Sequence, residues 1–85
     1  MGTNYYIDQG EGDDYYSYPH IGKTSRLSQG LTFIFFKSRY YQISLLQSID
    51  INDNIVNEYG ERTTVRDFLD YIGNLPYMES NEEFL

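Results

Sequence analysis

One run of apolar residues restricts the folds open to this chain. Residues 31–36 follow Gly30 and are apolar at every position except Thr32. An extended segment that is apolar on both faces is typical of a central β-strand covered on both sides. Left exposed, such a segment would promote aggregation. We therefore expect this strand to lie inside a sheet.

The core around that strand has no covalent support. The chain has 85 residues and no cysteine, so neither a disulfide nor a thiolate metal site can form, and a single histidine argues against a zinc site. This length fits one domain with one core. We expect a single domain over residues 1–85, with an ordered core over 1–72, an acidic tail over 73–85, and no metal or cofactor.

The clearest helix in the sequence lies between residues 64 and 73. One apolar face is formed by positions i, i+3, i+4 and i+7, which are Val65, Phe68, Leu69 and Ile72. Thr64 can cap the first turn. Gly73, followed by Pro76, ends the helix.

Short strands are expected at residues 3–7, around His20 and Ile21, and at residues 54–59. Together with the apolar run and the helix, they predict a small α+β domain. Its short antiparallel sheet of about three or four strands is packed by one clear C-terminal helix.

Residues 41–52 fit two periods. Alternate positions are mostly apolar, as in a strand, and only Gln47 interrupts the row. A helical stripe through Leu45 and Leu46 fits less well, because Ile43 falls outside it. The pattern leaves both structures open.

Charge is unevenly distributed along the chain. The net charge is −7, and it divides into −4 over residues 1–19, +4 over 20–49 and −7 over 50–85. A net acidic chain repels the phosphate backbone, which disfavours direct nucleic-acid binding. The acidic segments either meet a basic partner or only keep the protein in solution.

The sequence predicts neither membrane insertion nor secretion. No stretch approaches 18 consecutive apolar residues, and the N-terminus lacks a basic segment followed by an apolar one. We expect a soluble cytoplasmic protein with no membrane partner.

Tyrosine is unusually frequent, at 10 of 85 residues, and five tyrosines flank an acidic segment between Asp8 and Asp14. Tyrosine is enriched at interface hot spots, although neighbouring tyrosines on a strand also alternate between core and surface. The candidate partner-binding residues are Glu11, Asp13, Asp14, Tyr15, Tyr16 and Tyr18.

A second candidate site has different chemistry. The segment Gly22-Lys23-Thr24 is similar to the end of a phosphate loop, but Ser17 stands where such a loop needs another glycine. Binding of a small phosphate or nucleotide remains open, as does a purely structural turn in which the histidine packs. The candidate ligands are His20, Lys23, Thr24, Ser25 and Arg26.

Four short motifs follow one another along the chain: Gly2-Thr3-Asn4-Tyr5-Tyr6, His20-Ile21-Gly22-Lys23, Phe33-x-Phe35 and Glu58-Tyr59-Gly60. In this order they resemble a family of small bacteriophage proteins that begin GTNYY and carry HIGK and EYG segments. The resemblance covers residues 2–72 and implies a phage origin, expression in the host bacterial cytoplasm and a helix at 40–49. Many relatives carry two cysteines where this chain has the acidic residues 8–14, and the resemblance implies no reaction.

The small size, the missing catalytic motifs and the acids near tyrosines favour binding over catalysis. We expect a non-enzymatic phage accessory protein that binds a bacterial host protein and inhibits or redirects it. The favoured target is a defence system such as a nucleic-acid-binding CRISPR effector, blocked by steric or charge competition. The alternative is a protein that sequesters a nucleotide or phosphate signal through residues 20–26. The oligomeric state stays open.

Overall fold

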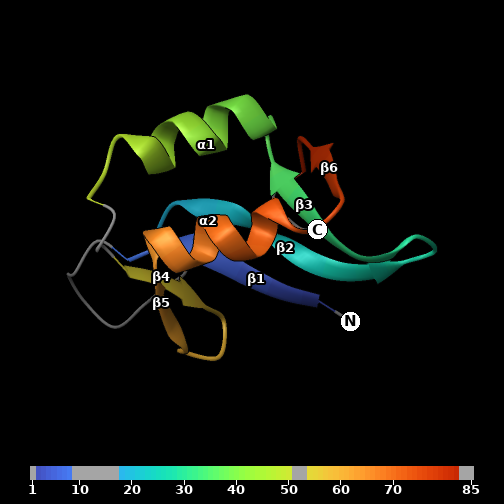
Figure 1. The fold of residues 1–85 in the computed structure, drawn as a ribbon, viewed down its shortest axis with the longest axis horizontal. Helices are drawn as coiled ribbons and strands as arrows, with labels where there is room; N and C mark the ends of the chain where they lie inside the picture. Colours follow the sequence, from blue (N-terminus) through green and yellow to red (C-terminus); the bar gives the residue numbers. More distant parts are fainter. Residues whose placement is uncertain (1, 9–17, 51–53, 83–85) are drawn as a thin grey trace.

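A mixed six-stranded sheet is the frame of the molecule (Figure 1). The computed structural model describes residues 2–8, 18–50 and 54–82. In chain order the elements are β1 (Gly2–Ile7), β2 (His20–Leu27), β3 (Gly30–Phe36), α1 (Arg39–Gln47), β4 (Asn54–Asn57), β5 (Arg62–Thr64), α2 (Val65–Gly73) and β6 (Tyr77–Ser80).

The strands lie in the order β5-β4-β1-β2-β3-β6. All neighbouring pairs are antiparallel except β3 and β6, which are parallel. The apolar run forms β3, between β2 and β6, where Phe33 is 0% and Phe35 is 2% exposed. The α+β class is confirmed, but the expectation of about three or four strands was wrong, because the sheet has six.

The additional strands are short segments that carry little pattern. β5 has three residues and β6 has four, which is too few for an alternation to be recognised. β6 comes from the segment expected to be an acidic tail. The backbone N–H of Phe33 donates to the carbonyl of Pro76 at 2.9 Å, which begins the parallel pairing with β3.

The ambiguous segment is a helix, so the expectation of a single clear helix was also wrong. Ser38 caps α1 by accepting a hydrogen bond from the backbone N–H of Tyr41 at 3.0 Å. The buried side chains of α1 are Gln42 and Leu46, one turn apart. Because a polar glutamine takes a core position, the apolar stripe looks incomplete in the sequence.

The predicted C-terminal helix is confirmed as α2. The Thr64 hydroxyl accepts from the backbone N–H of Asp67 at 3.2 Å, which satisfies one of the free amides of the first turn. Val65, Phe68 and Ile72 are buried along one face. Neither helix in the described ranges is long and apolar enough to cross a membrane.

Both helices contribute to one core against the same face of the sheet. Its buried members are Ile7, Ile21, Phe33, Phe35, Leu46, Ile55, Val65, Phe68 and Ile72. A second, smaller cluster contains Tyr6, Tyr18 and Val56. Tyr5 packs against the main core while its neighbour Tyr6 belongs to the second cluster, which is the alternation between faces that a strand imposes.

Candidate functional site

The HIGK segment begins β2 at an irregularity in its pairing with β1. Tyr5 lies opposite Gly22 and Tyr6 lies opposite His20, so Ile21 is an extra residue, as in a β-bulge. Ile21 turns into the main core and is 0% exposed. The bulge thereby directs His20 to the side of the sheet that carries Tyr6.

Glycine is required at the second position of the bulge. Gly22 has a φ of 158°, and a Cβ at this position would clash with the carbonyl oxygen of Ile34 on the neighbouring strand. The glycine thus allows β2 and β3 to approach each other. It serves a bulge within a strand rather than the expected turn.

His20 links parts of the chain that are far apart in sequence. Its Nε2 lies 3.0 Å from Oδ1 of Asn4. The backbone N–H and the Nδ2 of Asn4 both donate to Oε1 of Glu58, at 2.7 and 3.1 Å. The GTNYY, HIGK and EYG segments therefore meet in one hydrogen-bonded network.

The network determines which nitrogen of His20 donates. An ionised carboxylate only accepts hydrogen bonds, so Glu58 orients the Nδ2 of Asn4 toward itself and leaves Oδ1 facing the histidine. Nε2 of His20 must then carry a proton. The ring is stacked between Tyr6 and Phe36, at centroid distances of 4.9 and 5.6 Å, and the residue is 9% exposed. These contacts give His20 a role in packing.

The five candidate phosphate ligands are not gathered at one place. They lie on β2, an extended strand paired on both sides with β1 and β3. His20 and Thr24 are buried. Because side chains alternate along a strand, Lys23 and Ser25 lie on one face of the sheet and Thr24 and Arg26 lie on the other. A phosphate nest needs consecutive backbone amides directed at one point, and this paired strand does not present them.

Tyr18 is the candidate partner-binding residue that falls within the described part of the chain. It is 8% exposed and packs in the small cluster with Tyr6 and Val56. Its position fits the packing role of a core tyrosine rather than contact with a partner. The other candidates lie outside the described residues, and they are Glu11, Asp13, Asp14, Tyr15 and Tyr16.

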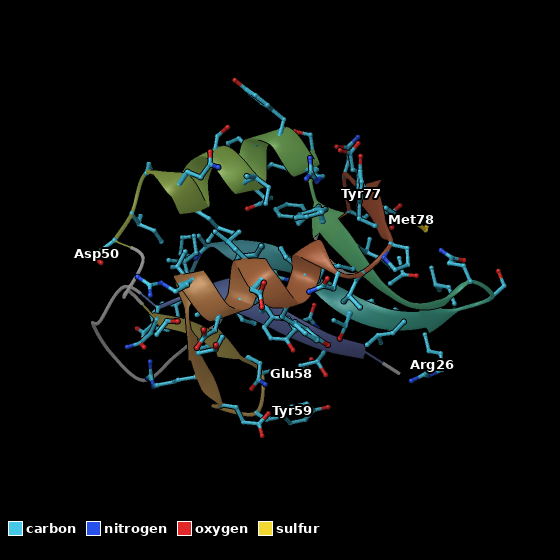
Figure 2. All side chains as sticks on the ribbon, in the orientation of Figure 1. Arg26, Asp50, Glu58, Tyr59, Tyr77 and Met78 are labelled. Carbon is cyan, nitrogen blue, oxygen red and sulfur yellow. The ribbon has the colours of Figure 1, made fainter. Side chains whose placement is uncertain are left out.

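The turn between β4 and β5 and the adjoining helix α2 expose acids and tyrosines together. Tyr71 is 41% exposed and lines one pocket with the exposed carboxylates Glu61 and Asp67. Tyr59 is 65% exposed and precedes Glu61 by two residues in the turn. We call these four residues the acidic tyrosine surface. Figure 2 shows Tyr59 at the outer edge of the molecule. None of these four residues was among the candidates from the sequence, although Glu61 and Asp67 contribute to the charge of −7 over residues 50–85.

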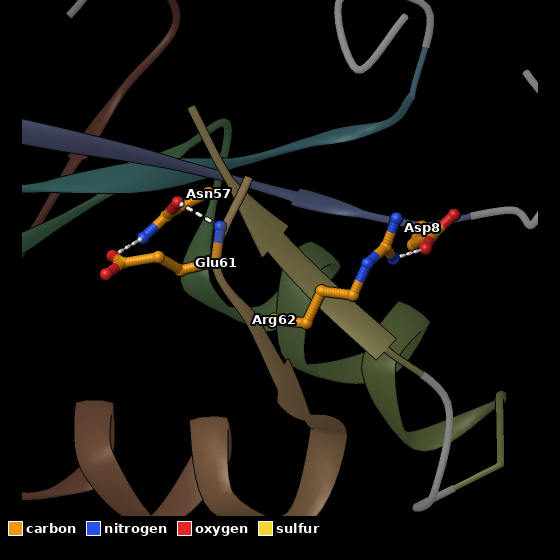
Figure 3. Close-up of polar contacts among 4 residues, drawn as sticks. All are labelled: Asp8, Asn57, Glu61 and Arg62. Atoms are coloured by element: carbon orange, nitrogen blue, oxygen red, sulfur yellow. Dashed lines mark hydrogen bonds and ion pairs between the residues drawn. The ribbon is translucent and has the colours of Figure 1, made fainter. Parts of the chain in front are cut away.

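Asn57 fixes the shape of this turn (Figure 3). Its Oδ1 accepts from the backbone N–H groups of Tyr59 and Glu61, at 2.9 and 3.0 Å, and its Nδ2 donates to Oε1 of Glu61 at 2.8 Å. Gly60 supplies the positive φ of 81° that the turn needs. The carboxylate of Glu61 is therefore held in a defined position.

The cation next to this turn is already paired within the protein. Arg62 forms an ion pair with Asp8, whose side chain is 8% exposed (Figure 3). The guanidinium charge is thus compensated by a buried carboxylate. It does not neutralise Glu61, the preceding residue.

Among residues 2–8, 18–50 and 54–82, the other exposed tyrosines lie near α1 and β6, and two of them lie beside cations. The Lys37 ammonium lies 4.9 Å from the ring centroid of Tyr41, and the Arg39 guanidinium lies 5.1 Å from that of Tyr77. Cation–π attraction stabilises such pairs. Tyr40, which follows Arg39, is 82% exposed. This region places its tyrosines beside cations, and it also contains Glu79, which accepts a hydrogen bond from the backbone N–H of Arg39 at 2.7 Å.

The fold places the chain among small α+β domains with a mixed sheet. Within residues 2–8, 18–50 and 54–82, no group of three or more histidine, aspartate or glutamate side chains is arranged to hold a metal ion. Compared with protein-family models, curated proteins and solved structures, the chain gives no significant match. Its function is therefore argued from its own residues.

Proposed function

We propose that this chain is a bacteriophage accessory protein that binds a bacterial host protein, and inhibits or redirects it, without catalysing a reaction. The acidic tyrosine surface carries the proposal. Tyrosine supplies a large contact area at low entropic cost. Carboxylates beside it attract a basic partner and speed association. The phage origin rests on the resemblance of the GTNYY, HIGK and EYG segments.

The position of His20 supports binding rather than catalysis. The ring is buried between two aromatic rings, and its Nε2 is hydrogen-bonded to Asn4. A general base must come within hydrogen-bonding distance of a substrate proton. The contacts of His20 instead support a structural role.

Host defence machinery, including CRISPR effectors, is the target class that we favour. Such effectors hold nucleic acid in positively charged channels. A protein with a net charge of −7 and an exposed acidic surface can compete with phosphate for such a channel. The mechanism proposed is steric and charge competition.

Capture of the partner from the host bacterium tests the proposal. The tagged protein is incubated with host lysate, washed at increasing salt, and the retained proteins are identified by mass spectrometry. We expect a bacterial protein with a basic surface, released as the salt concentration rises because screening weakens exposed charge pairs. Retention of no protein beyond those bound by an unrelated tagged protein of equal charge would contradict the proposal.

A plating assay tests the target class separately. Expression of the chain in bacteria that carry an active CRISPR system should raise the plating efficiency of a phage that this system targets. A matched strain without the system is the control, and its plating should not change. If capture succeeds but plating is unaffected across defence systems, the partner belongs to another class.

A further inference from the structure

A pocket of about 180 Å³ opens within the acidic tyrosine surface, between the β4–β5 turn and α2. Its walls include the aromatic rings of Tyr5, Phe68 and Tyr71, and the side chains of Glu61 and Asp67. Ordinary small-molecule sites enclose roughly 300–1,000 Å³. The pocket is therefore suited to the end of one side chain rather than to a nucleotide.

The aromatic walls are held in place by the core. Phe68 is 1% exposed, and its ring lies 5.1 Å from that of Tyr5 and 5.7 Å from that of Phe33. The face of an aromatic ring carries partial negative charge and attracts cations. Cation–π attraction is stronger where the ring and the cation are partly shielded from water than on an open surface.

Two carboxylates, of Glu61 and Asp67, and one guanidinium, of Arg62, line the pocket. Glu61 is held by Asn57, and Arg62, which also lines the pocket, is paired with Asp8. Burial raises the pKa of Tyr5, and the nearby Tyr71 and Glu61 raise it further. The carboxylates of Glu61 and Asp67 at the pocket would repel an anionic ligand.

We propose that the pocket binds one cationic side chain of the partner, an arginine or a lysine, against its aromatic walls and paired with Glu61 and Asp67. This inference rests on the proposed function and adds the chemistry of the residue that the partner contributes. Arginine fits the site in two ways, because its guanidinium both stacks on rings and pairs with carboxylates. Lysine contributes a single compact charge.

Amide chemical shifts of the full chain test this assignment without any partner protein. The ¹⁵N-labelled protein is titrated with N-acetyl-arginine amide, with N-acetyl-lysine amide, and with the citrulline analogue, which has nearly the shape of arginine but no charge. We expect saturable shifts around Asn57, Thr63 and Tyr71 with the cations only. The ratio of the two cation affinities decides between arginine and lysine.

Isosteric variants link the shifts to the two carboxylates. Glu61→Gln keeps an oxygen for Asn57, and Asp67→Asn keeps its shape, so both should fold. Each should weaken cation binding about two- to fivefold, as expected for a partly exposed charge pair. Asp70→Asn lies on the same helix but outside the pocket and should leave the affinity unchanged.

Four results would overturn the assignment: no shift with either cation, equal shifts with citrulline, shifts away from the pocket, or no change in Glu61→Gln and Asp67→Asn. Any of them leaves the capture of a host protein untouched. Conversely, cation binding in the absence of a captured partner would count against the proposed function alone.

Discussion

The side chain of Asn4, half-buried in β1, links two other parts of the sheet. Its side chain connects His20, at the start of β2, with Glu58, in the turn after β4. The strand pairing of β1 with β2 and β4 brings these residues together. The amide is suited to this role because it donates to the carboxylate and accepts from the histidine.

We predict that Asn4→Ala lowers the free energy of unfolding by about 1–3 kcal/mol, because it removes the side-chain hydrogen bonds to His20 and Glu58 and leaves the backbone N–H of residue 4 as the bond to Glu58. Urea unfolding measures the change. Asn81→Ala, at an exposed position, is the control and should stay within about 0.5 kcal/mol of the wild type. Equal effects of the two substitutions would show that the network does not stabilise the fold.

The raised pKa of Tyr5 predicts that the protein loses stability at alkaline pH. Burial, then Tyr71 and Glu61, raise its folded-state pKa above the ordinary value of 10.0. A group with a raised folded-state pKa contributes stability that is complete below its unfolded-state pKa and is lost as pH rises through the folded-state pKa. The free energy of unfolding should therefore fall above about pH 10.

Tyr5→Phe isolates this contribution, because every other tyrosine is present in both proteins. The free energy of unfolding of the wild type minus that of Tyr5→Phe should fall as pH rises from 9 to 11, measured by chemical denaturation. A constant difference over this range would contradict the raised pKa.

At the scale of helices and strands, the sequence predicts the elements whose pattern of apolar residues has no interruption. In α2, Thr64 and the four apolar positions define both the start and the buried face. In β3, an uninterrupted apolar run predicts a buried strand. These elements could be located because local pattern and tertiary packing agree.

Elements that depend on tertiary contacts could not be predicted. The buried face of α1 includes Gln42, whose polarity conceals the helical stripe, and the cap at Ser38 is the local indication of a helix. β5 and β6 are the outer strands of the sheet, and each pairs with one neighbour, β4 and β3 respectively. The acidic tyrosine surface could not be predicted either, because the turn brings Glu61 beside Asp67 only after folding.

Gln42 attaches α1 to the sheet. Its Nε2 donates to the carbonyl oxygens of His20 and Phe36, at 3.2 and 2.5 Å, and the residue is 2% exposed. We predict that Gln42→Glu lowers the free energy of unfolding by at least about 2 kcal/mol, because an ionised carboxylate cannot donate and is costly to bury. Thermal and urea unfolding measure this loss.

Gln47→Glu makes the same chemical change at the exposed C-terminal end of α1. It should cost less than about 1 kcal/mol, the usual effect of a negative charge at a helix C-terminus. If both variants are equally stable, the hydrogen bonds of Gln42 do not hold the helix in place.

At the scale of the whole molecule, exposed tyrosines lie with charged side chains in two separate places. The acidic tyrosine surface lies on the β4–β5 turn and α2, whereas Lys37 and Arg39 lie beside tyrosines near α1 and β6. Figure 2 shows Tyr59 and Tyr77 in well-separated parts of the molecule. The protein therefore offers two separate tyrosine-bearing surfaces, and we assign partner binding to the one on the β4–β5 turn and α2, where Glu61 and Asp67 are exposed.

The most direct measurement of that assignment is the affinity of the captured host protein for two matched double variants. Tyr59→Ser with Asp67→Lys alters the acidic tyrosine surface. Tyr40→Ser with Glu82→Lys makes the same exchanges elsewhere, and each pair raises the net charge from −7 by two. Melting temperatures establish that both variants fold.

We predict that the first variant loses at least about tenfold in affinity, as expected when hot-spot contacts are removed. The second variant should bind like the wild type apart from a small effect of net charge. Equal affinities of the two variants, or a larger loss in the second, would contradict the claim that the acidic tyrosine surface binds the partner.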